Sequence, residues 1–369
     1  TESDSDYDPL NTATTSMFMQ TRGTIDSPNI NTTYYYVSDA AVPEIQESLT
    51  YLTFRSPSDF TLVTARTWDG VLECSTDAIN WYIWKATAES VTSRNGKLYL
   101  RGVGNTRLCY GSVSYDRWLF NNSGDSITCT GNIENLLDFI TVAKGGHPPM
   151  AEGCFNYLFY GNAALISAPS LPATTLSKRC YFNLFLGTGI VKAPELPATT
   201  LAFQCYFGMF ERCDKLTIPP ELPATNLADE CYKHMFQNCT NLTSLPSLPA
   251  TSLKQDCYAY MFRGCTKILI SATKTSEYQI PYRIPSSGTA TTALNALTDM
   301  FDNTGGTFSG TPEINKTYYI GAGKSLKTLI AYNGTTVEMA EGQTATLICA
   351  GKKMKTDVVI IPAFAVDFT

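Results

Sequence analysis

The sequence predicts an α+β protein: a β-rich N-terminal cap domain, a central solenoid of near-26-residue repeats and a small β-rich C-terminal domain. Cysteines recur at nearly constant spacing in the middle of the 369-residue chain. Short β-branched and aromatic runs precede that region, as is typical of strands. A chain of this length exceeds what one compact core usually holds, which favours several structural units.

The repeats are most regular in the middle of the chain. Their leading cysteines follow one another at intervals of 26, 25, 26 and 26 residues: Cys154, Cys180, Cys205, Cys231 and Cys257. An aromatic residue follows each cysteine directly, Leu or Met follows four residues on, and Phe five residues on. Positions 0, 1, 4, 5 and 8 share one face of an α-helix, so each repeat is predicted to contain an amphipathic helix.

The apolar stripe of these helices is predicted to form the structural core. Free cysteine is among the most buried residue types, and aromatic rings beside it favour packing. The core residues are Cys180, Cys205, Cys231, Cys257, Phe185, Phe210, Phe236 and Phe262. The cysteines lack the short paired spacing and the histidines of zinc sites, so no metal is expected. Two cysteines eight apart on one helix lie too far apart for a disulfide.

Between the helices the motif Leu-Pro-Ala-Thr-X-Leu recurs, each time after a short apolar run. Each run is predicted to form a strand that a proline ends, and the strands to stack in a parallel ladder. The middle positions of these strands are the candidates for partner binding: Ser167, Lys192, Thr217, Thr243 and Ser244. The Leu-x-x-Leu pattern leaves open which middle residue points outward.

The flanking segments set the domain organisation. We expect an extended N-terminal arm (1–40), a β-sandwich-like cap domain (41–145), the solenoid (146–310) and a small β domain (311–369). Strands are expected at Leu72–Cys74, Trp81–Trp84, Lys97–Arg101 and Ile127–Thr130. In the C-terminal domain, Asn333-Gly334 predicts a hairpin, and strands are expected at Thr344–Cys349 and Val358–Ile361. Residues 27–35 match residues 311–319, which indicates either two related attachment strands or a shared Thr- and Tyr-rich composition.

The run LPATTLAFQCYFGMFERCDKLTIPPELPATNL (196–227) resembles the leucine-rich repeats of the BspA-like family, found on surfaces of gut and oral Bacteroidales and in some phages of gut bacteria. The C-terminal run AYNGTTVEMAEGQTATLICAGKKMKTDVVIIP (331–362) is similar to a β-rich segment common in virion proteins of tailed phages. The first resemblance implies a leucine-rich-repeat solenoid with a role in adhesion, no assigned catalysis and no fixed functional residues.

Together these features predict a non-enzymatic virion surface protein, such as a head fibre, capsid decoration or tail-associated protein. Its solenoid would expose an adhesion surface to a host glycan or protein. Other virion proteins, or further copies in a homo-oligomer, are the expected partners. The alternative is a bacterial cell-surface adhesin. The net charge of -6 without clustered Lys and Arg argues against nucleic acid. No window of 18 apolar residues supports membrane insertion.

No catalytic or cofactor-binding residue is expected. Gly321–Ser325 ends like a phosphate-binding loop, but Tyr318 stands where that loop needs glycine. The acidic run at residues 4–8 lacks the glycine and closing Glu of a calcium loop. Neither His147 nor His234 has a recognisable nucleophile partner. The four tryptophans fit a domain core better than a sugar platform. A glycan-acting enzyme would need paired carboxylates, and none is recognisable.

Overall fold

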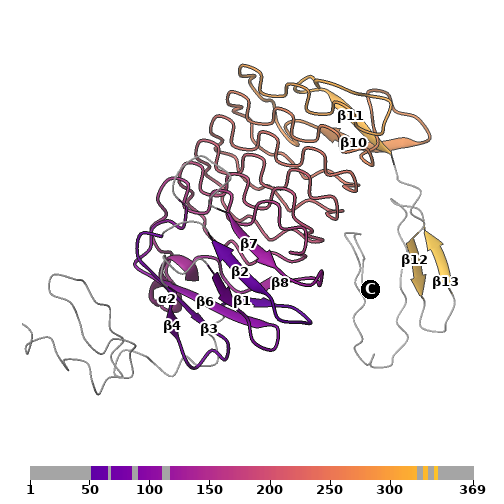
Figure 1. The fold of residues 1–369 in the computed structure, drawn as a ribbon. Coiled ribbons are helices and arrows are strands. Elements are labelled where there is room, and N and C mark those ends of the chain that lie inside the picture. Colours follow the sequence, from indigo (N-terminus) through magenta and orange to yellow (C-terminus); the bar gives the residue numbers. More distant parts are fainter. Residues whose placement is uncertain are drawn as a thin grey trace, which may run out of the picture.

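The computed structural model describes residues 51–64, 68–84, 90–109 and 117–321, together with two later strands (Figure 1). The elements are β1 (Leu52–Arg55), β2 (Thr61–Thr64), β3 (Val71–Ser75), β4 (Tyr82–Ile83), β5 (Ser90–Thr92), β6 (Lys97–Val103), β7 (Trp118–Asn121), β8 (Thr128–Thr130), α2 (Asn135–Ala143), β9 (Ile270–Ser271), β10 (Tyr278–Arg283), β11 (Thr317–Gly321), β12 (Lys327–Ile330) and β13 (Thr336–Met339). The described chain is therefore β-rich, with one α-helix.

The N-terminal cap consists of two antiparallel sheets and helix α2. One sheet has the order β4-β3-β6-β1-β8, the other β5-β2-β7. Strands lie at each of the four segments where the sequence predicts them. The side chains of Trp68, Trp84 and Trp118 are buried in the core between these elements, and the ring of Trp84 lies 5.8 Å from that of Trp118. Three of the four tryptophans are thus packing residues.

The predicted repeat helices are absent, and the α+β fold class is wrong. From Ala151 to Leu269 the described chain forms tight turns instead of helices and strands. In the turn segment that follows the start of each repeat, every fourth residue has positive φ, as at Arg179 (56°), Asn183 (51°) and Gly187 (67°). An α-helix of L-residues needs φ near -63° throughout, so these residues exclude it. The four-residue turn buries positions 0, 1, 4, 5 and 8 just as a helix face would.

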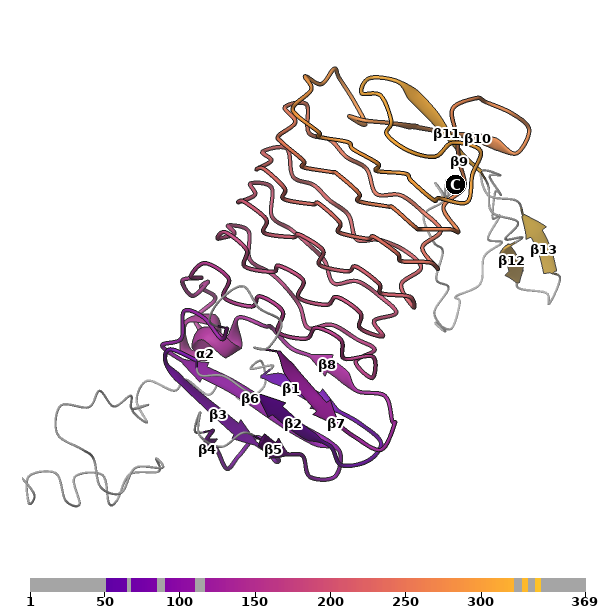
Figure 2. The same cartoon turned by 45° about the horizontal axis from the view of Figure 1, so that its top comes forward.

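The turns exist because alternate backbone N–H groups have different partners. Tyr181 N donates to Cys205 O of the next repeat (3.0 Å), and Asn183 N to Phe207 O (2.8 Å). The intervening Phe182 N donates within its own repeat, to Arg179 O (3.1 Å). A helix would use all of these groups internally. Each repeat is therefore a flat coil bonded to its neighbours, and the coils lie side by side in a repeat stack, residues 151–310 (Figure 2).

The predicted strand of each repeat is also absent. From Ala151 to Leu269, neighbouring coils are joined by isolated parallel bridges instead of strands: Ser167 with Lys192, Thr175 with Thr200, and Thr200 with Asn226; Ser252 forms a further bridge with Thr291. Prolines lie two residues after Ser167 and Lys192, and three residues before Thr175, Thr200, Asn226 and Ser252. Proline has no N–H to donate, so pairing cannot extend into a ladder on that side of each bridge. The helix-and-strand unit expected from the leucine-rich-repeat resemblance is not what these repeats form.

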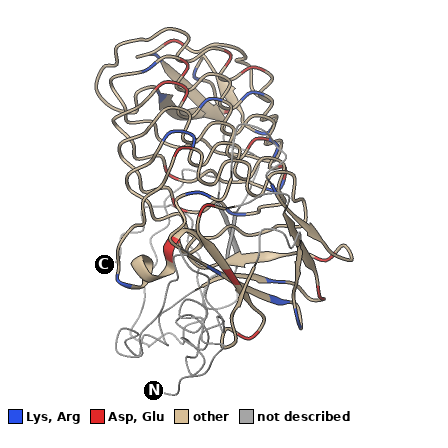
Figure 3. Ribbon diagram, turned by 60° about the vertical axis from the view of Figure 1, so that its left-hand side comes forward, with Lys and Arg blue, Asp and Glu red and all other residues tan. Residues whose placement is uncertain are grey.

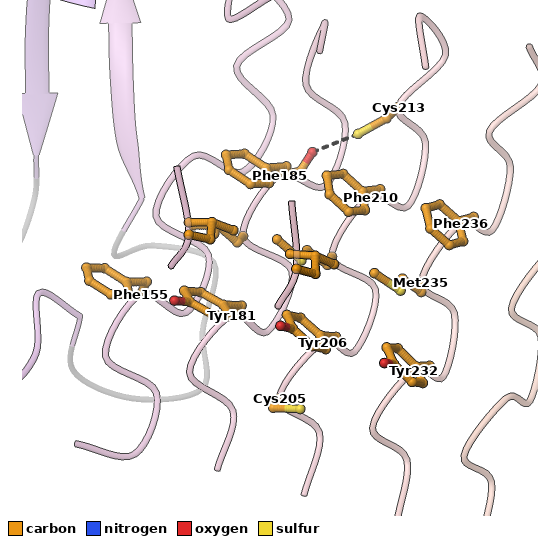
Figure 4. Packing of buried hydrophobic residues seen from close by; sticks show 14 of the residues in the cluster. Phe155, Tyr181, Phe185, Cys205, Tyr206, Phe210, Cys213, Tyr232, Met235 and Phe236 are labelled. Atoms are coloured by element: carbon orange, nitrogen blue, oxygen red, sulfur yellow. Dashed lines mark hydrogen bonds between the residues drawn. The ribbon is translucent and has the colours of Figure 1, made fainter. Parts of the chain in front are cut away.

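The interior of the stack consists of columns of identical side chains. The eight predicted core residues are all 0 % exposed. Phe236 stacks on Phe210 at 5.7 Å between ring centroids (Figure 4). On its other side it stacks on Phe262 at 5.6 Å, and both pairs of rings are within 4° of parallel. A second column runs from Phe155 through Tyr181, Tyr206, Tyr232 and Tyr258. Each coil therefore supplies its neighbours with both hydrogen bonds and aromatic packing.

The second cysteine of a repeat fills a position that needs a small buried donor. Cys239 Sγ lies 2.9 Å from Phe210 O of the preceding coil, and Cys213 makes the same contact with Phe185 O (Figure 4). At the equivalent position Thr188 Oγ1 donates to Phe185 O (2.8 Å) within its own coil. Threonine and cysteine thus both place a donor against this carbonyl.

Both ends of the stack are closed by other segments. Cap backbone extends the first coil: Leu108 N donates to Cys154 O (2.9 Å) and Trp118 N to Leu158 O (2.8 Å). The last coil begins at Ala296, and the segment that follows it accepts its outward N–H groups. Asp299 N donates to Thr311 Oγ1 (2.8 Å), Phe301 N to Gly310 O (3.0 Å) and Asn303 N to Ser309 Oγ (3.1 Å). A sheet of order β10-β11-β9 covers this end, and one hydrophobic cluster runs from Leu52 to Tyr318.

Several sequence predictions fall on residues outside the described ranges. These are the N-terminal arm (1–40), the acidic run within it, most of the loop Gly321–Ser325, and the C-terminal strands expected at Thr344–Cys349 and Val358–Ile361. The hairpin expected at Asn333-Gly334 is described only in its two flanking strands, β12 and β13, which pair antiparallel.

Replacing Phe236 with Ala should lower the free energy of unfolding by about 3–5 kcal/mol, because it removes a ring from the middle of a fully buried column. Phe182→Ala, at a half-buried ring, is the matched control and should cost clearly less. Urea unfolding followed by far-UV circular dichroism measures both. Equal losses in the two variants would contradict the packing described.

The isosteric variants Cys239→Thr and Cys239→Val should differ in stability by about 1 kcal/mol, the usual net value of one hydrogen bond. Threonine retains a donor for the buried carbonyl and valine does not. Thermal and urea unfolding of the two variants under reducing conditions would detect this difference. A valine variant as stable as the threonine variant would show that the donor is unimportant.

Candidate interaction surface

The five residues predicted to bind a partner lie along one edge of the repeat stack, here called the bridge edge. Ser167 and Lys192 form a parallel bridge, and Thr243 N donates to Thr217 O (3.0 Å). Lys192, Thr217 and Thr243 are exposed, whereas Ser167 and Ser244 are half-buried. Ser167 Oγ is hydrogen-bonded to Cys129 N and Cys129 O, both at 2.9 Å, so this residue ties the stack to β8.

Polar side chains extend the bridge edge across successive coils. Asn241 Nδ2 donates to Asp214 O (2.6 Å), Lys267 Nζ to Asn241 Oδ1 (2.5 Å), and Thr243 Oγ1 to Thr217 O (3.1 Å). These bonds join equivalent or adjoining positions of neighbouring coils and hold the side chains in a row. Figure 3 shows Lys and Arg interspersed with Asp and Glu along the stack. The bridge edge therefore presents ordered hydrogen-bond donors and acceptors, and positive and negative charges are mixed along it.

Sequence reasoning missed two apolar residues on this edge. Val191 is 53 % exposed and Ile218 is 61 % exposed, beside the predicted Lys192 and Thr217. The Leu-x-x-Leu pattern assigns only one middle residue outward, whereas the irregular coil exposes both. Large exposed apolar side chains next to hydrogen-bonding groups are typical of binding surfaces.

The Thr pair of the Leu-Pro-Ala-Thr-X-Leu motif forms a second exposed edge, here called the hydroxyl edge. Both residues of each pair are exposed in the four coils that carry the motif: Thr174, Thr175, Thr199, Thr200, Thr225, Asn226, Thr251 and Ser252. Thr291, which bridges to Ser252, and Thr292 are exposed in the next coil. The sequence analysis used this motif only as a turn signal. Because the pair differs little between coils, this edge is chemically uniform.

The turns themselves form a third surface with two ladders. In the first, Arg179 Nε donates to Gln204 Oε1 (2.6 Å) and Gln204 Nε2 to Glu230 Oε2 (2.9 Å), after which Lys233 bridges to Glu230 (3.5 Å). The second ladder is a row of half-buried rings, one per coil: Tyr157, Phe182, Phe207, His234 and Tyr260. Phe182 and Phe207 stack face to face at 4.6 Å, so the row mainly presents ring edges.

Titratable groups inside the stack are held in their neutral forms. Burial raises the pKa of the Cys213 and Cys265 thiols to about 12, and it raises those of Cys180, Cys205 and Cys231 well above their usual value. Since the thiolate is the nucleophile and the metal ligand, these thiols are suited to packing. Burial also lowers the pKa of His234, against the effect of its hydrogen bond to Gln237.

The other histidine lies where the cap meets the stack. His147 Nδ1 is 2.8 Å from Glu134 Oε2, and the Glu134 side chain is fully buried. Among the described residues, no group of three or more His, Cys, Asp or Glu side chains is arranged to hold a metal ion. The described part of the chain also contains no helix long and apolar enough to cross a membrane.

No protein-family model, no curated protein and no solved structure matches this chain.

The free energy of unfolding should fall as the pH drops from 6.5, the ordinary pKa of histidine, to the lower pKa of His234 in the folded chain. The unfolded chain binds the proton more readily over that interval. In His234→Tyr, which copies the residue at Tyr260, this part of the pH dependence should disappear. Urea unfolding at pH 7 and pH 5 tests both. Identical pH dependence in the two proteins would show that His234 makes no contribution.

Proposed function

We propose that this protein is a non-enzymatic attachment protein on the surface of a tailed-phage virion, and that the bridge edge of its repeat stack binds a host surface glycan or protein. The main observation in support is the contrast between a nearly invariant interior and a varied bridge edge. Interior positions repeat Cys, Tyr, Leu or Met, and Phe from coil to coil. Such an interior is a scaffold whose edge residues can change without altering the fold.

The bridge edge varies in the way that recognition requires. Successive coils place a hydroxyl, an ammonium group and apolar side chains at neighbouring positions, as at Ser167, Lys192, Val191 and Ile218. The backbone carrying these groups is hydrogen-bonded to a neighbouring coil, from Val191 N to Ile166 O (3.1 Å) and from Thr243 N to Thr217 O (3.0 Å). The groups are therefore pre-organised and lose little entropy on binding. A glycan, which combines hydroxyls with apolar faces, or a mixed polar and apolar protein patch fits this edge.

The virion assignment comes from the resemblance of residues 331–362 to a segment of tailed-phage virion proteins, and the adhesion role from the BspA-like resemblance of the repeats. Assembly with other virion proteins or with further copies of this chain belongs to the same proposal. A bacterial surface adhesin would present the same edge from a cell envelope, so location separates the two.

Mass spectrometry of purified phage particles and of cell envelopes from the source culture tests the location. We expect the chain in particles, at a copy number typical of a capsid or tail component. Its presence in envelopes alone would replace the virion assignment with the cellular adhesin.

A variant carrying Lys192→Ala, Thr217→Ala and Thr243→Ala should bind host cells at least about tenfold more weakly, equivalent to about 1.4 kcal/mol. The matched control carries Thr174→Ala, Thr199→Ala and Thr225→Ala on the hydroxyl edge and should bind normally. Both sets lie on the surface and should leave folding intact. Binding of labelled protein to cells measures the effect, and equal loss in both variants would remove the bridge edge from the proposal.

A further inference from the structure

The β3–β4 hairpin presents a cluster of apolar side chains to solvent, here called the edge patch. It consists of Ile79 (81 % exposed), Tyr82 (64 %) and Ile83 (38 %). These are three of the large exposed hydrophobic residues of the described chain, and they lie within five positions. β4 is the outermost strand of the five-stranded sheet, and β3 is the described strand that pairs with it.

A strand edge of this kind can pair with a further strand. Both β4 residues are exposed, so neither face of the strand is covered, and neither residue is charged. Natural sheets protect a free edge with charges, prolines or a covering segment, because its unpaired backbone groups readily accept a strand. The shortness of β4 offers some protection, but an exposed Tyr-Ile pair beside Ile79 favours a covering segment.

The chain enters the described structure beside this patch. Tyr51, the first described residue, packs its ring edge-on against Trp81 at 4.7 Å between centroids, and Trp81 directly precedes β4. Arg101 lies over the Trp81 ring at 4.0 Å and fixes it in place. Tyr51, the residue to which the preceding chain is joined, therefore lies beside the hairpin that carries the edge patch.

The same N-terminal residues contain a sequence whose second copy leads into a strand, with Thr317, Tyr318 and Tyr319 of that copy lying in β11. Residues 28–35, PNINTTYY, match residues 312–319, PEINKTYY. The second copy leads into β11, the central strand of its sheet, which pairs with β10 and β9 and buries Tyr318. The first copy has Asn29 and Thr32 where the second has Glu313 and Lys316, so it is uncharged and suits an apolar edge.

We propose that residues 30–37 of this chain add as a further strand to the free edge of β4 and cover the edge patch. Residues 38–50 connect this strand to Tyr51 and can span about 40 Å when extended. Tyr34, Tyr35 and Tyr36 supply rings for cross-strand pairing with Tyr82 and Ile83. The occupant is the segment of the same chain, because a short tether gives it an effective concentration on the order of millimolar.

Hydrogen exchange of the full chain, followed by mass spectrometry, tests this docking. In the unmodified protein we expect amide exchange in residues 30–37 to be at least about tenfold slower than in an unstructured peptide of the same sequence. Tyr82→Asp combined with Ile83→Asp should abolish that protection. The matched control, Val191→Asp combined with Ile218→Asp, places the same charges on the bridge edge and should retain it.

Each outcome decides the proposal. Unprotected residues 30–37 in the unmodified protein, or protection that survives the β4 substitutions, would overturn it. Protection that depends on protein concentration, with a dimer seen by light scattering, would assign the edge to the segment of a second copy instead. Should the β4 variant also lose protection in β6, Ile79→Asp alone, on the exposed turn, takes its place and should still weaken protection of residues 30–37.

Discussion

The alternation of backbone hydrogen bonds between one coil and the next is the constraint on which the structure depends. Half of the N–H groups in the turns close their own coil, and half reach the neighbouring coil. A single coil cannot satisfy the second half, so no repeat is stable alone. Aromatic columns, buried thiols and surface ladders all follow from this arrangement, because it places equivalent positions of successive coils directly beside one another.

Much of this arrangement could be predicted from the sequence. The spacing of the leading cysteines identifies the repeats, and the Cys-Tyr and Met-Phe pairs identify the buried positions. The secondary structure could not be predicted, because a turn every four residues and a helix with 3.6 residues per turn bury almost the same positions. The distinguishing signal is positive φ, and here it falls on Arg179, Gln204 and His234 as well as on glycine. Arginine, glutamine and histidine side chains do not indicate positive φ, so the sequence gives no sign of it.

The candidate surface was predictable to a similar degree. Apolar runs before the prolines indicated an edge that joins neighbouring coils, and the predicted residues do lie along it. Ser167 is an exception in its contacts, because β8 occupies the position that a preceding coil would take. That substitution of cap backbone for a coil depends on tertiary packing between residues far apart in the sequence. For the same reason, Val191 and Ile218 could not be recognised as exposed.

The closing of the last coil has a consequence for how this protein can evolve. Ser309, Gly310 and Thr311 accept the N–H groups that every coil offers to a successor, so this terminator recognises backbone that is common to all coils. A gene duplication or deletion of one whole repeat would leave both junctions chemically unchanged. The stack can therefore gain or lose whole repeats. Its length would change by roughly 5 Å per repeat, the ordinary spacing between adjacent hydrogen-bonded strands.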